Sequence, residues 1–205
     1  MRLDLCAEAV RLARVLAELM PDEPEAQGLL ALLLLLHARS PARLAADGSL
    51  VRLADQDRQL WDLSQIAQGQ AIVRACVEGG RPGPYQIQAA INAVHSVAPS
   101  FDRTDWHAIL TLYDQLYALT PTPVVALNRA VALAEVRGAA AGLAAVDDLR
   151  SSGLDSYYLF HATRADLLRR LGRTTEAAAA YTTARALTAN PVEQAFLDSR
   201  RATLS

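Results

Sequence analysis

The sequence predicts an all-α protein in which antiparallel helix pairs stack as a superhelical array. First, its 205 residues include 40 Ala and 33 Leu, which are strong helix formers, while the aromatic residues that favour strands make up only 5%. Second, apolar residues recur with the helical period of 3.6 along most of the chain. Third, similar residues recur at spacings of 34 and 68 positions. An all-β fold is excluded.

The apolar period defines ten helical segments. In chain order they are 3–20, 24–39, 55–78, 84–97, 104–119, 123–136, 139–150, 156–171, 174–189 and 192–202. Proline separates several of them: Pro24 and Pro123 stand at the first turn of a helix, where a missing N–H costs nothing, and Pro191 starts the last segment. We therefore expect short connections between antiparallel neighbours.

Two helix starts carry capping signals, and one stretch is irregular. Thr104-Asp105 and Thr174-Thr175-Glu176 are typical N-caps with an acid in the first turn. Residues 40–54 form the only long irregular stretch, where Ala46-Asp47-Gly48-Ser49 indicates a turn. We expect a loop or small hairpin there.

The repeat identifies the type of array. At an offset of 68, Tyr113 aligns with Tyr181 and Pro123 with Pro191, and Gly138 and Gly172 lie 34 residues apart at turns between helices. Thirty-four residues is the period of the tetratricopeptide repeat (TPR), a helix pair that buries its apolar face only by stacking on its neighbours. The sequence therefore predicts a TPR-like array.

The last repeat shows the TPR pattern of small and large residues. With Gly172 as the turn, Ala165 and Ala177 are the small residues where the two helices approach, Tyr181 fills the gap to the next unit, and Ala184 packs the following turn. The repeat before it is degenerate, with Asp147 in the tyrosine position. Residues 1–103 are expected to be divergent helix pairs and residues 104–205 TPR-like repeats with a terminal capping helix, together forming one continuous domain.

Charge and motifs exclude several functions. Twenty basic residues against 22 acidic ones give a net charge of -2, which is unlike a duplex-binding domain. Neither nucleotide-binding loops nor H-E-x-x-H or G-x-S-x-G motifs occur, so we expect no enzymatic activity, no metal and no cofactor. The two cysteines, Cys6 and Cys76, lack metal-ligand spacing and indicate buried thiols in a reducing cytoplasm. The longest apolar run, residues 29–36, is too short to span a membrane.

The densest polar cluster is Asp55-Gln56-Asp57-Arg58 followed by Trp61-Asp62. On a continuous helix, Asp55, Arg58 and Asp62 would share one stripe, so that the acids pair with the arginine and Trp61 packs beside it. Three interpretations stay open: a structural N-cap with a salt-bridged face, a partner-binding surface, and a divalent cation site. The cation site needs Asp57 to converge with the other acids, but it points away from the stripe.

Two further sets of polar residues are candidates for binding. Gln86 and Gln88, with His95 downstream, lie on an Ala-rich helix, where buried amides either line a groove or tie neighbouring helices together. Asn128 and Arg129 raise the same choice, and Asn128 falls on the concave side of its helix, where a TPR array offers an amide to a bound peptide. The aromatic residues Trp106 and Tyr113 are expected in the core.

Five segments resemble a known family. They are LCAEAVRLAR (5–14), PEAQGLLAL (24–32), DQDR (55–58) with Trp61 and Asp62, GPYQIQAAI (83–91) with His95, and PVVALNRAV (123–131). Together they are similar, in order and over the whole chain, to the TPR-like C-terminal extension of a group of bacterial extracytoplasmic-function (ECF) sigma factors.

The resemblance implies a regulator of transcription initiation. It implies docking on the sigma regions of the same full-length protein or on the RNA polymerase core, and a small YCII-like (DGPF) protein is a candidate partner. Promoter DNA would be read by regions that cannot be placed in this sequence. The family defines no residue roles, so the interaction surface we expect consists of the candidate residues above: Asp55, Asp57, Arg58, Trp61, Gln86, Gln88, His95, Asn128 and Arg129.

Two rival functions remain. One is a stand-alone TPR-type adaptor that binds a peptide or protein in its concave groove and has no link to transcription. The other is an enzyme or small-ligand binder that uses Asp55, Asp57 and Asp62.

Overall fold

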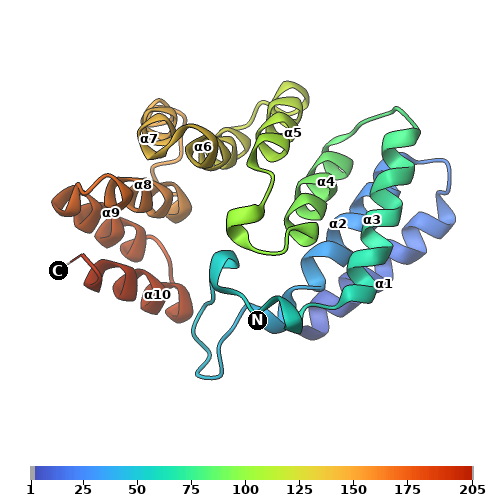
Figure 1. The fold of residues 1–205 in the computed structure, drawn as a ribbon, viewed down its shortest axis with the longest axis horizontal. Helices are drawn as coiled ribbons and strands as arrows, with labels where there is room; N and C mark the ends of the chain where they lie inside the picture. Colours follow the sequence, from blue (N-terminus) through green and yellow to red (C-terminus); the bar gives the residue numbers. More distant parts are fainter. Residues whose placement is uncertain (1–2, 205) are drawn as a thin grey trace. The chain divides into compact units, whose positions relative to one another are not determined.

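A computed structural model describes residues 3–204, and within that range the chain is all α-helical, as predicted (Figure 1). Its helices are α1 (Leu3–Leu19), α2 (Pro24–His37), α3 (Leu63–Glu78), α4 (Pro84–Val97), α5 (Trp106–Leu119), α6 (Pro123–Arg137), α7 (Ala139–Asp147), α8 (Tyr158–Arg170), α9 (Thr174–Ala186) and α10 (Pro191–Ala202). Four short 3₁₀ turns are η1 (Ser40–Ala42), η2 (Leu53–Asp55), η3 (Arg58–Leu60) and η4 (Phe101–Arg103). None of these helices is long and apolar enough to cross a bilayer.

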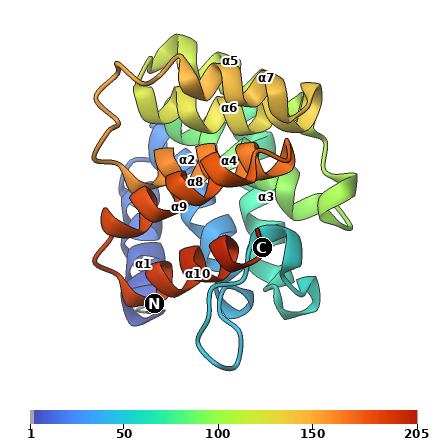
Figure 2. The same cartoon turned by 90° about the vertical axis from the view of Figure 1, so that its left-hand side faces the viewer.

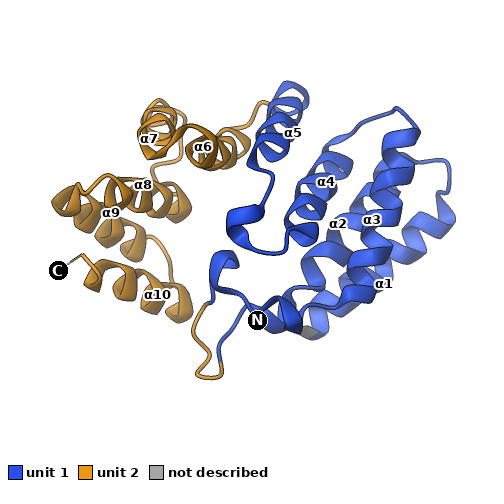
Figure 3. Ribbon diagram, viewed as in Figure 1, with its two compact units in different colours: residues 1–45, 51–120 blue, residues 46–50, 121–205 orange. Residues whose placement is uncertain are grey.

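The helices group into two compact units (Figure 3). Unit 1 comprises the chain up to residue 45 and residues 51–120, and unit 2 comprises residues 46–50 and the chain from residue 121. The division therefore follows α5, at the Thr120–Pro121 bond.

Unit 1 is built around α2, which packs against α1, α3 and α4. Its apolar run explains this central position, because a helix that is apolar on every side must be covered on every side. Leu34 and Leu35 are at most 1% exposed, and each contributes about 2 kcal/mol by its removal from water. Helix α5 then packs on α4.

In unit 2 each helix packs against the next one in the sequence, from α6 to α10 (Figures 1 and 2). Gly138 (φ 89°) and Gly172 (φ 73°) form the turns within the two helix pairs, in the left-handed region that glycine adopts without strain. This confirms the predicted 34-residue spacing of the turns.

The small-and-large pattern of the last repeat is also confirmed. Ala165, Ala177 and Ala184 are fully buried and Tyr181 is 2% exposed, all within one core that α10 completes with Leu197. Alanine at the closest points lets the helix backbones approach, which is how adjacent repeats share one core.

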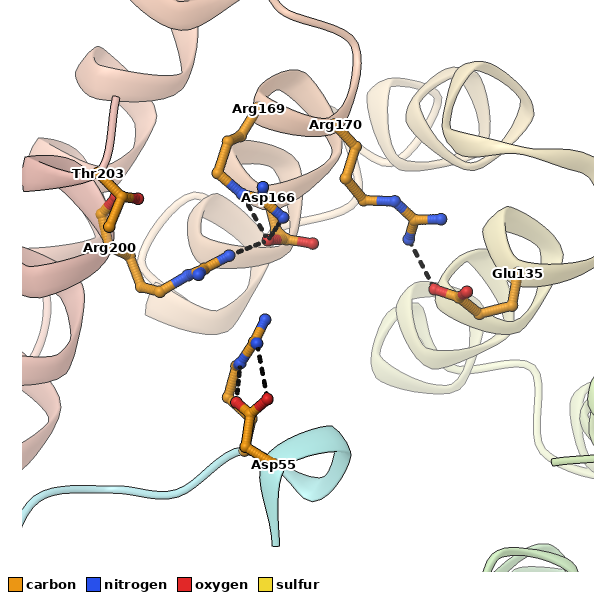
Figure 4. Close-up of polar contacts among 8 residues, drawn as sticks. Asp55, Glu135, Asp166, Arg169, Arg170, Arg200 and Thr203 are labelled. Atoms are coloured by element: carbon orange, nitrogen blue, oxygen red, sulfur yellow. Dashed lines mark hydrogen bonds and ion pairs between the residues drawn. The ribbon is translucent and has the colours of Figure 1, made fainter. Parts of the chain in front are cut away.

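Ion pairs connect the helices of unit 2 at its margins. Arg170 of α8 donates to Glu135 of α6 at 2.6 Å, and Asp166 of α8 accepts from Arg200 of α10 at 2.8 Å as well as from Arg169 (Figure 4). The Asp166–Arg200 pair links α8 to α10, two helices that are separated in sequence by α9.

The largest correction to the predicted helices concerns residues 55–62. The helix expected over 55–78 begins only at Leu63, because Asp57 and Asp62 each cap the turn that follows them and so divide the segment. The Asp57 carboxylate accepts the N–H of Gln59 at 2.9 Å, and the Asp62 carboxylate accepts the N–H groups of Ser64 and Gln65. The stripe predicted for Asp55, Arg58 and Asp62 therefore does not exist.

The other helix boundaries differ less from the predicted ones. Asp105, not Thr104, caps α5 through the N–H of Ala108, and Thr174 lies inside α9, so the N-cap expected at Thr174-Thr175 is wrong. Between α2 and η2 the chain forms the expected turn, with the Ser49 N–H bound to Asp47 and Gly48 at φ 82°.

Candidate functional site

The three acids of the 55–62 segment serve local structure. Asp55 pairs with Arg52 at 2.7 Å on the surface (Figure 4), so the predicted pairing of Asp55 with Arg58 is wrong. Within residues 3–204 no three His, Cys, Asp or Glu side chains are grouped to hold a metal ion. Asp57 and Asp62 are the N-caps of η3 and α3 and accept backbone N–H groups from the first turn of each.

Arg58 contacts two of the other predicted residues. Its guanidinium carbon lies 4.4 Å from the centroid of the Trp61 ring, a cation–π contact that confirms the predicted packing of this pair. Its Nη1 donates to the backbone oxygen of His95 on α4 at 3.0 Å. Trp61 itself is 5% exposed and belongs to the core around α2.

His95 lies in an unusually non-polar and cationic environment. Its ring packs edge-on against Trp106 of α5, with centroids 5.2 Å apart, and its Nδ1 is buried. Burial first, and then the charges of Arg39 and Arg58, lower the pKa of His95 to about 4. This histidine is therefore neutral near pH 7.

Gln86 ties two helices together and also lines a hollow between α3, α4 and α5, so both of the alternatives above apply to it. Its side-chain nitrogen donates to Glu25 of α2 at 3.2 Å and to the backbone oxygen of Arg81 at 2.8 Å, and the residue is 7% exposed. Gln88 is half-buried and donates to the oxygen of Pro84, one turn back on its own helix.

Asn128 and Arg129 lie on α6 in unit 2, whereas the other seven candidates lie in unit 1. Asn128 is exposed and Arg129 is half-buried. Of the nine candidates, the structure brings together Arg58, Trp61 and His95; Asp55 and Asp57 lie on the exposed turns beside them.

Sequence reasoning missed Arg39, which is central to this region. Arg39 follows the last turn of α2, is 7% exposed, and donates through Nη2 to Asn92 of α4 at 2.6 Å. Burial, and then repulsion from Arg43 and Arg58, lower its pKa to about 10. The only signal in the sequence is an arginine directly after an apolar helix, which normally indicates an exposed end.

Unit 1 also has two hollows on either side of α3. One, of about 350 Å³, lies between α3 and the α1–α2 connection and is lined by Pro21, Gln27, Ile72 and Arg81 among others. The second, of about 280 Å³, is more apolar and is lined by residues of α3, α4 and α5, including Val77, Ile87 and Leu112. Cys76 borders both. Cys6 and Cys76 are free thiols, but each is half-buried, so the burial expected for them is wrong.

One exposed stripe of α1 is apolar, beside exposed charged residues such as Glu8 and Arg11. Leu5, Leu12, Leu16 and Leu19 are 38% to 76% exposed and follow one another at helical spacing along one stripe. The opposite side of α1, with Ala13 and Ala17, packs on α2. A helix with two apolar sides has one that is not covered by this chain.

Comparisons with known proteins place the chain beside sequences without an assigned function. A model of DUF6596, a family of unknown function, matches residues 1–77. An uncharacterized protein of Rhizobium meliloti (strain 1021) is 48% identical over 194 residues, which cover 95% of this chain and 46% of that protein. No solved structure matches. The chain thus spans about half the length of the curated relative it matches and is similar over its first 77 residues to DUF6596.

Proposed function

We propose that this chain is a protein-interaction module that regulates transcription initiation as part of an ECF sigma factor in the bacterial cytoplasm. Three observations support the proposal. They are the helical-repeat fold and the sequence resemblance to the extension of that sigma-factor group, together with the length of the relative, which is about twice that of the part it shares with this chain. Helical arrays of this kind serve mainly as binding surfaces.

The observation that carries the proposal is the uncovered leucine stripe of α1. Four exposed leucines follow one another on one stripe of this helix, and contiguous exposed apolar patches mark interfaces. In this proposal the stripe docks on the sigma regions of the same longer polypeptide. RNA polymerase core and a YCII-like (DGPF) protein are the alternative partners.

Run-off transcription tests the proposal. Core polymerase is combined with the full-length protein, with a version lacking this domain, and with the double variant Leu12→Asp/Leu19→Asp. We expect both changes to alter the amount of transcript in the same direction, because an aspartate in a docked apolar face leaves a buried charge.

The matched control is Leu63→Asp. Leu63 is 73% exposed at the start of α3 and lies outside the α1 stripe, so it should leave transcription unchanged. Circular dichroism of each variant confirms that the helices remain. If domain deletion leaves transcript levels unchanged, the proposal fails and the adaptor function gains support. If deletion matters and the double variant does not, the transcriptional role stands but the docking face is elsewhere.

A further inference from the structure

A cluster of one buried and two half-buried arginines in unit 1 has no counter-charge. The cluster consists of Arg39 at the end of α2, Arg43 after η1 and Arg58 on η3. They lie close enough together that the positive charges of Arg43 and Arg58 repel that of Arg39. Among residues 3–204, no carboxylate comes within ion-pair distance of any of these three arginines. Burial of charge without a partner is costly, so such sites normally hold an opposite charge.

Unused hydrogen-bond donors gather in the same place. In the part of the chain that the structure describes, three buried side-chain nitrogens of this region have no hydrogen-bond partner: Arg39 Nε, Arg58 Nη2 and Trp61 Nε1. Arg39 and Trp61 are both more than nine-tenths buried, so solvent on the surface does not reach these N–H groups. His95 Nδ1, also buried and unpartnered, is a fourth donor in one of its tautomers.

Arg39 and Arg58 both bond to the same stretch of α4. Arg39 donates to Asn92 and Arg58 to the oxygen of His95, and residues three apart share a helix face. The turns η1 and η3, which place the two arginines, contact each other. The cluster opens to the surface at Arg43 and Arg58, which are both half-buried.

We infer that Arg39, Arg58 and Trp61 form a binding site for an oxyanion, the phosphoryl or carboxylate group of a small molecule. Arg39 and Arg58 each have one unused guanidinium nitrogen that can donate to an oxygen of such a group, and the indole N–H of Trp61 adds a third donor. One anionic group supplies both the missing acceptors and the missing negative charge. This inference is independent of the proposed role in transcription.

The test is a thermal melt and a calorimetric titration of this chain with inorganic phosphate, with acetate, and with sodium chloride at the same ionic strength. We expect the melting temperature to rise in phosphate or acetate beyond its rise in chloride, because a ligand that binds only the native state stabilises it. If phosphate raises the melting temperature and acetate does not, the ligand group is a phosphoryl group. If acetate raises it at least as much as phosphate does, the ligand group is a carboxylate.

Three variants locate the effect. Arg58→Gln should weaken binding by about tenfold or more, and Trp61→Phe, which keeps the ring but loses the N–H, by about twofold to tenfold. Arg52→Gln is the matched control: Arg52 is on the same segment, is exposed and pairs with Asp55, so binding should be unchanged. If Arg58→Gln does not fold, Arg58→Lys replaces it, since it keeps the charge but loses the paired N–H groups.

Two results would overturn the inference. One is the absence of any stabilisation beyond that of chloride at millimolar phosphate and acetate. The other is stabilisation that persists in both the Arg58 and the Trp61 variants, which would mean an adventitious ion only.

Discussion

Glu25 of α2 caps the first turn of α4 at Tyr85, which lies sixty residues later in the chain. Its carboxylate accepts the backbone N–H of Tyr85 at 2.9 Å and that of Gln86 at 3.2 Å. The residue in the N-cap position, Gly83, has no side chain to do this, and a side chain there would collide with the Glu25 carboxylate. The cap therefore also fixes how α2 and α4 pack.

Replacing Glu25 by Ala should lower the free energy of unfolding by about 1–2 kcal/mol, since the first N–H groups of α4 lose their acceptor. Urea unfolding followed by circular dichroism measures it. Glu18→Ala, at an exposed position on α1, is the control and should change stability by less than about 0.5 kcal/mol. Equal losses in the two variants would contradict the capping role.

Acid should destabilise the protein through His95. The pKa of His95 is lowered to about 4 by burial and by Arg39 and Arg58, whereas the unfolded side chain titrates near 6.5. The unfolded state then binds more protons between these values, so stability falls as the pH drops from about 6.5 to about 4. Stability measured in half-unit pH steps should show this loss in the native sequence and not in His95→Gln. The exposed His107 provides the control variant, His107→Gln, which should retain the loss.

A second, more acidic loss should come from Asp62. The backbone N–H of Gln65, followed by the side chains of Ser64 and Gln65, lowers the pKa of Asp62 from its ordinary value of 3.8 to about 2. The stabilisation is complete above the unfolded pKa and is lost as the pH falls from about 4 towards 2. Asp62→Asn keeps an N-cap acceptor but cannot be protonated in this range, so its stability should fall less steeply there. An unchanged slope would show that other acids account for the loss.

Gly142 allows α7 to approach α6 closely. A Cβ at this position would meet the Cβ of Ala134 and lie 3.1 Å from the oxygen of Ala130. Gly142→Ala should therefore destabilise unit 2 by about 1–3 kcal/mol despite its better helix propensity. Gly79→Ala is the matched control, because its nearest neighbour, the oxygen of Cys76, lies at 3.4 Å. A Gly142→Ala protein as stable as the native one would show that the two helices separate at little cost.

The parts of the fold that were predictable are those with local causes. Pro24, Pro84 and Pro123 each stand at the first turn of a helix, and Gly138 and Gly172 stand at turns, because the conformations of proline and glycine are set by the residue itself. The apolar period wrongly predicted a helix at residues 55–62, and the cause there is also local. It registers where apolar residues fall, but it does not register that Asp57 and Asp62 offer the backbone a competing acceptor.

The candidate site was predictable only in part. Arg58 beside Trp61 follows from their spacing, whereas Arg39 with Asn92 and Glu25 with α4 are pairs more than fifty residues apart. Such pairs form only between helices that become neighbours in the fold. No local pattern in a single sequence shows which helices those are. The degenerate Asp147 is similar: it replaces the tyrosine of the repeat and binds Arg164 of α8 at 2.7 Å, a polar substitute for an apolar contact.

The Asp166–Arg200 pair has a consequence for how α10 opens. In a stack where each helix touches only its neighbours, the last helix can detach while the rest stays folded, and its amide hydrogens then exchange with solvent fastest. Arg200 also ties α10 to α8, one helix further in, through an ion pair whose carboxylate is 36% exposed, so detaching α10 breaks this pair as well as its packing on α9. Fraying of α10 is thereby coupled to α8, and α8, α9 and α10 should lose protection against exchange together.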